Sequence, residues 1–222
     1  MSHAREDSAT YDARTASELR RARITGRALP LLGDDIDTDR IIPARFLRSV
    51  VFEGLGEHAF ADDRAALRAQ GGLHPFDDPA RAGASLLVVG HHFGCGSSRE
   101  HAPQALYRRG LRAIVGGSFA EIFFGNCVSV GLPCAQLSPA DLARVFALTS
   151  QDASLELSLD LTRRELEVGA ERFPVSLPEA ARVAWVEGTW DSTAELASAA
   201  EETRRVARSL PYMNEFLTET VD

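Results

Sequence analysis

Apolar side chains are concentrated in short runs that alternate with segments of helical character. Residues 85–89 (SLLVV) and 112–115 (RAIV) are apolar runs of strand length, which is typical of strands that are buried on both faces. A helix is predicted after each run, over residues 101–109 and over residues 118–125. The order strand, helix, strand, helix predicts a parallel βαβ unit, because parallel strands need a crossover connection.

Capping residues mark the expected ends of these two helices. Pro103 suits the first turn of a helix, and Gly110 follows the first helix as a terminating residue. Ser118 and Glu121 have the spacing of a capping box, so the second helix is predicted to begin at Ser118. Gly125 is predicted to end it.

The second half of the chain adds an antiparallel component. Residues 155–161 (LELSLDL) alternate strictly between apolar and polar, which predicts a strand with one solvated face. A turn at residues 162–164 leads into residues 165–168, which predicts a hairpin. The other predicted elements are strands at residues 24–32 and 173–176, a short helix at residues 62–70, and final helices at residues 178–188 and from residue 192 to a point before Pro211.

These elements predict an α/β fold with one mixed domain over residues 24–222, which includes the C-terminal helices. The length of 222 residues suits a single domain with appendages. Residues 1–23 are polar and poor in bulky apolar groups, which predicts a flexible N-terminal tail with room for a short helical stretch.

The composition of the chain indicates which binding partners to exclude and where in the cell the protein is expected. The 24 basic and 32 acidic residues give a formal net charge of −8, which argues against nucleic acid and anionic membranes, because both require a basic face. No apolar run approaches the roughly 20 residues of a membrane span, and the N-terminus has no signal-peptide architecture. A cytoplasmic location is expected. Cys95, Cys127 and Cys134 contain no CxxC pair, so neither a disulfide framework nor a metal or cluster site made by this chain alone is expected.

The most informative loop is GHHFGCGSSRE, which lies between a predicted strand and a predicted helix. Its glycines let the backbone bend sharply, and the N–H groups at the start of a helix attract anions. Arg99 adds donors that match a carboxylate, and Ser97 and Ser98 add two hydroxyls. These features predict a turn that binds a carboxylate or a phosphate. Ser97 and Glu100 also have capping-box spacing, so plain helix capping is an open alternative. Arg99 breaks a GxGxxG match, and no GxSxG occurs.

Several long blocks resemble one protein family. FGCGSSREHAPQAL is similar to the signature of the swivelling domain of the aconitase superfamily, in the form carried by isopropylmalate isomerase small subunits. DDIDTDRIIPARFL and SFAEIFFGNCVSVGLP resemble two further blocks of these subunits, and EGTWDSTAEL and RSLPYMNEF resemble the ends of bacterial members. The resemblance spans residues 24–216 in order. It implies a three-layer β/β/α swivelling domain with a mixed sheet.

The resemblance also implies a reaction and a partner. The family moves a hydroxyl between adjacent carbons by dehydration and rehydration, converting 2-isopropylmalate and 3-isopropylmalate through 2-isopropylmaleate in leucine biosynthesis. A [4Fe–4S] cluster with an open iron site acts as the Lewis acid and is carried by the large subunit. This chain is therefore expected to bind no cofactor itself, to form a heterodimer with the large subunit, and to contact a small dicarboxylate substrate.

Family roles transfer onto particular residues. Ser97 matches the serine that removes a proton from carbon, and Arg99 matches the arginine that binds a substrate carboxylate. Thr38 and Asp39 match a pair near the active site, and Ser98 is assigned to the substrate with them. Cys95 stands where aconitases have glutamate and is expected to be a packing or loop residue.

Arg48 makes a second substrate an alternative to isopropylmalate. It lies in a segment where relatives tune recognition of the variable arm of the substrate, and a cation there suits a third carboxylate, as in homoaconitate. For Arg48, the alternative to a role in substrate binding is an arginine that faces solvent.

A stand-alone anion-binding regulatory module is an alternative function of another class. His91 and His92 have either a structural or a substrate-orienting role. The acidic loop residues Asp34, Asp35 and Asp37 are expected to be solvated or bonded to local backbone.

Overall fold

Seven strands form one mixed sheet in the computed structural model, which describes residues 16–47 and 52–213. Their order is β4-β3-β2-β1-β5-β6-β7. The strands are β1 (Arg23–Leu31), β2 (Leu86–Val89), β3 (Ala113–Gly116), β4 (Cys134–Gln136), β5 (Glu156–Asp160), β6 (Glu165–Val168) and β7 (Glu171–Pro174). Strand β1 pairs in parallel with β2 and antiparallel with β5, so the parallel and antiparallel halves of the sheet meet at β1.

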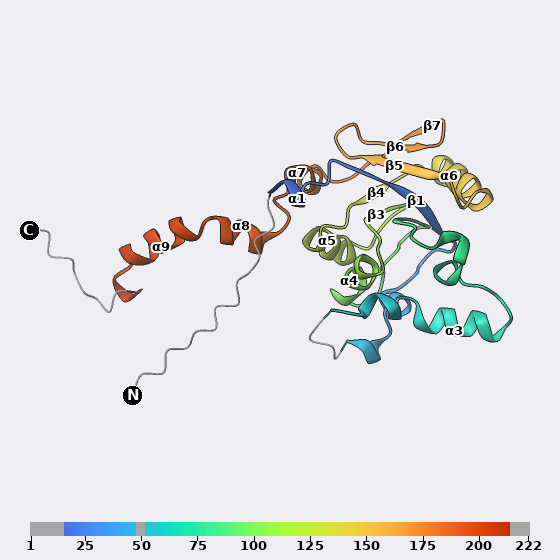
Figure 1. Cartoon of the computed structure of the whole chain (residues 1–222), viewed down its shortest axis with the longest axis horizontal. Helices are drawn as coiled ribbons and strands as arrows, with labels where there is room; N and C mark the ends of the chain where they lie inside the picture. The colour runs from blue at the N-terminus through green and yellow to red at the C-terminus, as the bar shows by residue number, and fades with distance from the viewer. Residues whose placement is uncertain (1–15, 48–51, 214–222) are drawn as a thin grey trace, which may run out of the picture.

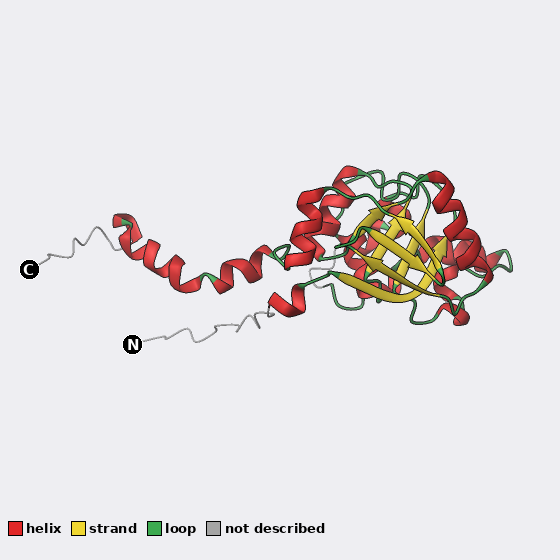
Figure 2. Cartoon of the chain, turned by 90° about the horizontal axis from the view of Figure 1, so that it is seen from above, coloured by secondary structure: helices red, strands yellow, loops and turns green. Residues whose placement is uncertain are grey.

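The helices lie around this sheet and beyond it (Figure 1). They are α1 (Ala16–Leu19), α2 (Thr38–Ile41), α3 (Ala61–Ala69), α4 (His101–Arg108), α5 (Glu121–Val130), α6 (Pro139–Gln151), α7 (Glu179–Glu187), α8 (Ser192–Ser198) and α9 (Ala200–Ser209). Helices α8 and α9 extend away from the sheet as an arm (Figure 2). In the described part of the chain, no helix has the length and apolar character required to cross a bilayer.

Strand β2 shows how the layers are built. Its residues Leu87 and Val89 pack with the buried side chains of α4 and α5, whereas Leu86 and Val88 pack on the other side with residues of the antiparallel strands such as Leu157. All four β2 side chains are buried, because successive residues of a strand point to opposite faces and both faces are covered. The predicted three-layer β/β/α arrangement and the parallel βαβ unit are confirmed.

The N-terminal segment is part of the folded body from Ala16 onward. Leu19 is buried, and its carbonyl oxygen accepts a hydrogen bond of 2.7 Å from the indole nitrogen of Trp190. The backbone N–H of Arg21 donates to the carbonyl of Trp185 at 2.7 Å. The expected flexible tail over residues 1–23 therefore does not extend to residues 16–23, because one apolar side chain and these two hydrogen bonds attach them. Residues 1–15 lie outside the described residues.

Helix α5 differs from its predicted bounds at both ends. It begins at Glu121, not at Ser118, and Gly131 terminates it, whereas Gly125 lies inside it. The reason is tertiary: Ala120 donates its N–H to the carbonyl of Phe93 at 3.0 Å, which holds the preceding residues extended. The Ser118 hydroxyl accepts from the N–H of His92 and is not available as a cap.

Helix α2, strand β4 and helix α6 were not predicted, and one predicted helix is divided. Strand β4 and helix α6 follow α5, and α6 is capped by Ser138, whose hydroxyl accepts from the N–H of Asp141 at 3.2 Å. The sequence Ser138-Pro139 followed by Asp141 was the available signal for this helix start. The final helix predicted from residue 192 is two helices, α8 and α9, separated at Ala199.

Candidate functional site

Two loops that follow neighbouring parallel strands form the candidate site. Residues 32–37 follow β1, and residues 90–100 follow β2. Strands β1 and β2 pair in parallel, with Leu31 opposite Val89. The carboxyl ends of both strands therefore lie at the same edge of the sheet, which is where ligands bind in open α/β folds.

Backbone hydrogen bonds join the two loops along their length. The N–H of Asp35 donates to the carbonyl of His91 at 3.0 Å, and the N–H of Gly94 donates to the carbonyl of Ile36 at 2.7 Å. The N–H of Thr38 then donates to the carbonyl of Cys95 at 2.9 Å. These bonds fix the position of the first loop relative to the second, although the two loops are far apart in sequence.

Thr38 continues this connection with its side chain. Its residue is 2% exposed, and its hydroxyl donates to the carbonyl oxygen of Ser97 at 2.9 Å. Thr38 also begins α2, which is capped by Asp37 through a 2.8 Å bond from the N–H of Arg40. The predicted site residue Thr38 therefore contacts the backbone at Ser97, with its hydroxyl buried between the loops.

Arg99 of the second loop and Asp39 of helix α2 form a two-bond ion pair. The guanidinium of Arg99 donates to both carboxylate oxygens of Asp39, with the second bond at 2.8 Å. The side chain of Arg99 is 15% exposed and that of Asp39 is 55% exposed, so the pair lies at the rim of the site. These bonds use two of the five guanidinium N–H groups, which leaves donors for another carboxylate.

The turn before α4 has the donors of an anion site. Ser97 and Ser98 are both exposed. Among the described residues, no acceptor is bonded to the backbone N–H groups of Ser97, Ser98 or Arg99. Helix α4 begins at His101 with no side-chain cap, so the alternative that Ser97 and Glu100 form a capping box is wrong.

Glycine gives this turn its shape. Gly94 and Gly96 have φ angles of 79° and 89°, in the left-handed region that side chains disfavour. A Cβ atom added at Gly94 would lie 2.1 Å from Cγ of Phe123, whose ring packs edge-on against Phe93. The backbone of the second loop therefore approaches α5 more closely than any other residue type allows.

Replacing Gly94 with alanine is expected to lower the free energy of unfolding by about 2–5 kcal/mol, because backbone strain and overlap with Phe123 add. Gly71→Ala is the matched control: Gly71 has a φ of 76°, but a Cβ there would meet no atom within 4 Å. The control is expected to lose about 1–2 kcal/mol. Urea denaturation of both variants measures the difference, and equal losses would contradict the close packing on Phe123.

The remaining residues named from the sequence are Arg48, two histidines and three cysteines. Arg48 lies outside the described residues. His91 and His92 are exposed at the start of the second loop, and the Nδ1 of His92 lies 2.8 Å from a carboxylate oxygen of Asp35. Burial, followed by the charges of Asp37 and Asp35, raises the pKa of the Cys95 thiol. Cys127 and Cys134 are buried, in agreement with their expected role as small core residues.

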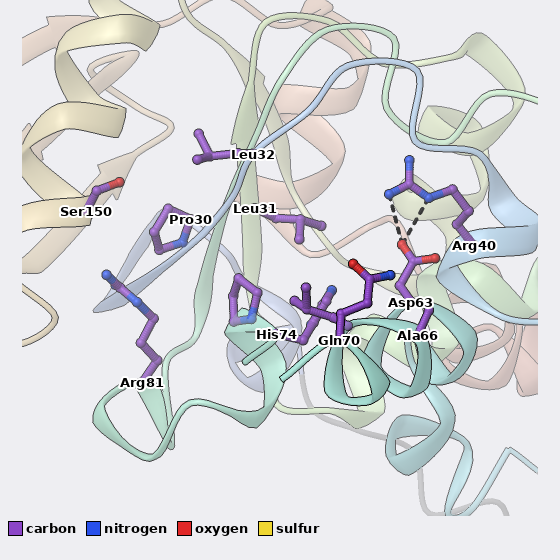
Figure 3. Close-up of a pocket in the computed structure, with 12 residues that line it drawn as sticks. Pro30, Leu31, Leu32, Arg40, Asp63, Ala66, Gln70, His74, Arg81 and Ser150 are labelled. Carbon is purple, nitrogen blue, oxygen red and sulfur yellow. Dashed lines mark hydrogen bonds and ion pairs between the residues drawn. The ribbon is translucent and has the colours of Figure 1, made fainter. Parts of the chain in front are cut away.

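A separate cavity of about 570 Å³ lies beside the end of β1 (Figure 3). Its lining includes Arg40, Asp63, His74 and Arg81 but not Ser97 or Arg99. Both arginines in it already have an anionic partner: Arg40 pairs with Asp63 at 2.9 Å, and Arg81 lies 3.9 Å from the carboxylate of Asp78. The cavity has no uncompensated charge for an anionic substrate, and the candidate site remains the exposed pair of loops.

His74 makes the stability of this region sensitive to pH. Burial lowers the pKa of its imidazole below 6.5, against the opposing charges of Asp63 and Asp77. The Nδ1 of His74 accepts from the N–H of Phe76 at 3.2 Å, so the neutral ring carries its proton on Nε2. Below pH 6.5 the unfolded chain binds this proton more readily than the folded chain, so stability falls as the pH is lowered toward the folded pKa.

His74→Asn is expected to remove this contribution, because asparagine retains a cap for the N–H of Phe76 but does not titrate. Between pH 7 and pH 5 the stability of the parent chain should fall more steeply than that of the variant, by at most about 1.4 kcal/mol per pH unit. Urea midpoints across this range test it. Parallel pH profiles would mean that His74 titrates alike in both states.

Comparisons with known proteins found chains of similar sequence and a similar solved structure. The family model of the aconitase C-terminal domain matches residues 22–139. The chain is 50% identical over 192 residues to a 3-isopropylmalate dehydratase small subunit of Synechocystis, covering 86% of this chain and 94% of that one. It is 49% identical over 189 residues to a Thermus thermophilus protein of the same name, covering 85% and 94%. A crystal structure of 3-isopropylmalate dehydratase from Methanocaldococcus jannaschii has a TM-score of 0.60 at 26% identity, covering 84% and 98%.

Proposed function

Because this chain belongs to the family of 3-isopropylmalate dehydratase small subunits, we propose that its two joined loops supply the proton-transferring and carboxylate-binding residues of that reaction. The chain acts as the small subunit of an aconitase-family hydro-lyase in leucine biosynthesis, which isomerises 2-isopropylmalate and 3-isopropylmalate through 2-isopropylmaleate. The observation that carries the site proposal is the convergence of Ser97, Arg99 and Asp39 at one exposed edge of the sheet. Neither a homoaconitate enzyme nor a stand-alone anion-binding module is favoured by these relatives.

Ser97 acts as the base that takes the proton from the substrate carbon. Its hydroxyl is exposed, while its backbone is held by the hydroxyl of Thr38. A serine is basic enough only as an alkoxide. The N–H groups of Ser97, Ser98 and Arg99, which bond to no acceptor within residues 16–47 and 52–213, are suited to offset that charge. The positive end of α4 adds to this effect. Dehydration delivers the carbon-bound proton to Ser97 Oγ, and rehydration returns it.

Arg99 binds a substrate carboxylate through the guanidinium donors that Asp39 leaves unused. Asp39 fixes the plane of the guanidinium by its two bonds, so the remaining donors point in a defined direction. Ser98, exposed beside Arg99, adds a hydroxyl donor to the same carboxylate. Thr38 acts as a positioning residue for Ser97. Arg48, which has no described structure, keeps its proposed role at the variable arm of the substrate.

The iron–sulfur cluster is proposed to reside on the large subunit. A [4Fe–4S] cluster requires three or four thiolates around one space. This chain has three cysteines, and two of them, Cys127 and Cys134, are buried in the core. Its cysteines do not form such a set. The large subunit would accordingly complete the site at the exposed face of the two loops.

A cytoplasmic location of the protein stays a prediction.

Co-expression with a large subunit tests the proposal. After anaerobic cluster reconstitution, the complex is expected to convert isopropylmalate, whereas this chain alone is expected to be inactive. A parallel assay with a tricarboxylate of the homoaconitate type separates the two substrates. Turnover of the tricarboxylate but not of isopropylmalate would contradict the assignment and make Arg48 the residue to examine for specificity.

A further inference from the structure

Three side chains with metal-binding atoms converge at the outer edge of the joined loops. Asp35 belongs to the first loop, and His92 and Cys95 belong to the second. A carboxylate oxygen, an imidazole nitrogen and the thiol sulfur all lie within 4.8 Å of one another. Asp35 and His92 are 57 positions apart in sequence, so their proximity comes from the pairing of the loops.

We propose that Asp35, His92 and Cys95 bind a zinc ion. Carboxylate oxygen, imidazole nitrogen and thiolate sulfur are the three ligand types that zinc uses in proteins, and three protein ligands with one open position make a known class of site. Zinc–ligand bonds of about 2.0–2.3 Å place neighbouring ligand atoms roughly 3.3–3.8 Å apart in a tetrahedron. To reach this geometry, the side chains must open the 2.8 Å contact between Asp35 and His92 and bring ligand atoms that lie up to 4.8 Å apart closer together.

The backbone beneath the cluster is already in place. The bond from the N–H of Asp35 to the carbonyl of His91 joins the loops next to two of the ligands. The bond from the N–H of Thr38 to the carbonyl of Cys95 holds the third. An ion therefore has to order side chains and not the loops themselves, which lowers the entropic cost of binding.

The local charge favours a cation. Asp35 and Asp37 face the Cys95 thiol, with Arg40 as the opposing positive group. The negative charges of these two carboxylates attract Zn²⁺. Binding replaces the thiol proton by the ion, so the sulfur becomes a thiolate and about one proton per zinc passes to solvent at neutral pH. The imidazole binds in its neutral form, through one of its two ring nitrogens.

The test uses the full-length, untagged chain and Co²⁺ as a spectroscopic probe, followed by displacement with Zn²⁺. Thiolate coordination is expected to produce an intense near-ultraviolet charge-transfer band that disappears when Zn²⁺ is added, with release of about one proton per ion. Cys127 and Cys134 are buried, so this band reports on Cys95. Cys95→Ser, His92→Ala and Asp35→Asn should each weaken zinc binding by about 10-fold or more.

His91→Ala is the matched control, because His91 is an exposed neighbour of His92 that is not part of the cluster. It is expected to bind like the parent chain, and circular dichroism confirms that every variant is folded. Absence of the charge-transfer band, or equal zinc affinity in the parent and in folded Cys95→Ser, would overturn the proposal. These readouts do not depend on turnover, so they stay separate from the proposed dehydratase role.

Discussion

Replacing Ser97 with alanine is expected to lower the turnover number of the assembled enzyme by about 10²- to 10⁴-fold, the usual contribution of a positioned base. The substitution removes one exposed oxygen and leaves the carbonyl that Thr38 contacts, so the joined loops should keep their arrangement. Steady-state assay of the reconstituted complex measures the loss, and gel filtration measures assembly. Turnover near the parent rate in the assembled variant would rule out Ser97 as the base.

Ser98→Ala provides the matched comparison for this prediction. Ser98 is the neighbouring exposed hydroxyl on the same turn, so its removal reproduces the change in polarity without removing the proposed base. Loss of one hydrogen bond to a charged carboxylate should raise the Michaelis constant by about 10-fold, with a smaller change in turnover number. An equal fall in turnover number for both variants would indicate damage to the turn as a whole.

Replacing Arg99 with lysine is expected to lower kcat/KM by about 10- to 100-fold, mainly through a higher Michaelis constant. A guanidinium can bond to Asp39 and to a substrate carboxylate with separate pairs of donors, whereas an ammonium group is a point charge that cannot match both in a plane. Each charge-assisted hydrogen bond is worth about 1.5–3 kcal/mol, which sets the expected range.

Asp39→Asn separates the two functions of Arg99. Asparagine keeps one acceptor oxygen but removes the charge, so Arg99 should be less firmly oriented while its full charge remains available to the substrate. A smaller rise in the Michaelis constant than for Arg99→Lys is expected. If Arg99→Lys leaves kcat/KM unchanged, Arg99 serves only to join the loops through Asp39.

Local patterns predicted most of the sheet and several helices. The runs 85–89 and 112–115 are strands β2 and β3 because continuous apolar sequence of that length is stable only when both faces are covered. The strict alternation at residues 155–161 predicted β5. Pro103 lies in the first turn of α4 and Gly110 follows its end, as predicted. These features depend on residues close in sequence, so they could be recognised without the fold.

The sequence predictions failed where a residue that locally signals one structure instead bonds to a segment distant in sequence. Ser118 and Glu121 have the spacing of a capping box, yet the hydroxyl of Ser118 accepts from His92 and α5 starts later. Leu19 lies in a segment that the sequence predicts to be a polar tail, yet Trp190, 171 positions away, donates a hydrogen bond to its carbonyl. In both cases the partner is remote in sequence, and no local pattern reports it.

For the site, the sequence by itself determined the chemistry of the second loop: glycines for a left-handed backbone, hydroxyls, an arginine and a helix start. Only the tertiary structure decided how these groups are used. Parallel pairing of β1 with β2 brings the first loop against the second. As a result, Asp39 binds two of the guanidinium N–H groups of Arg99, and the hydroxyl of Thr38 donates to the carbonyl of Ser97. The same pairing brings Asp35 to His92 and Cys95. Spacing along the chain could not reveal these contacts, because they depend on hydrogen bonds between strands that are more than fifty residues apart.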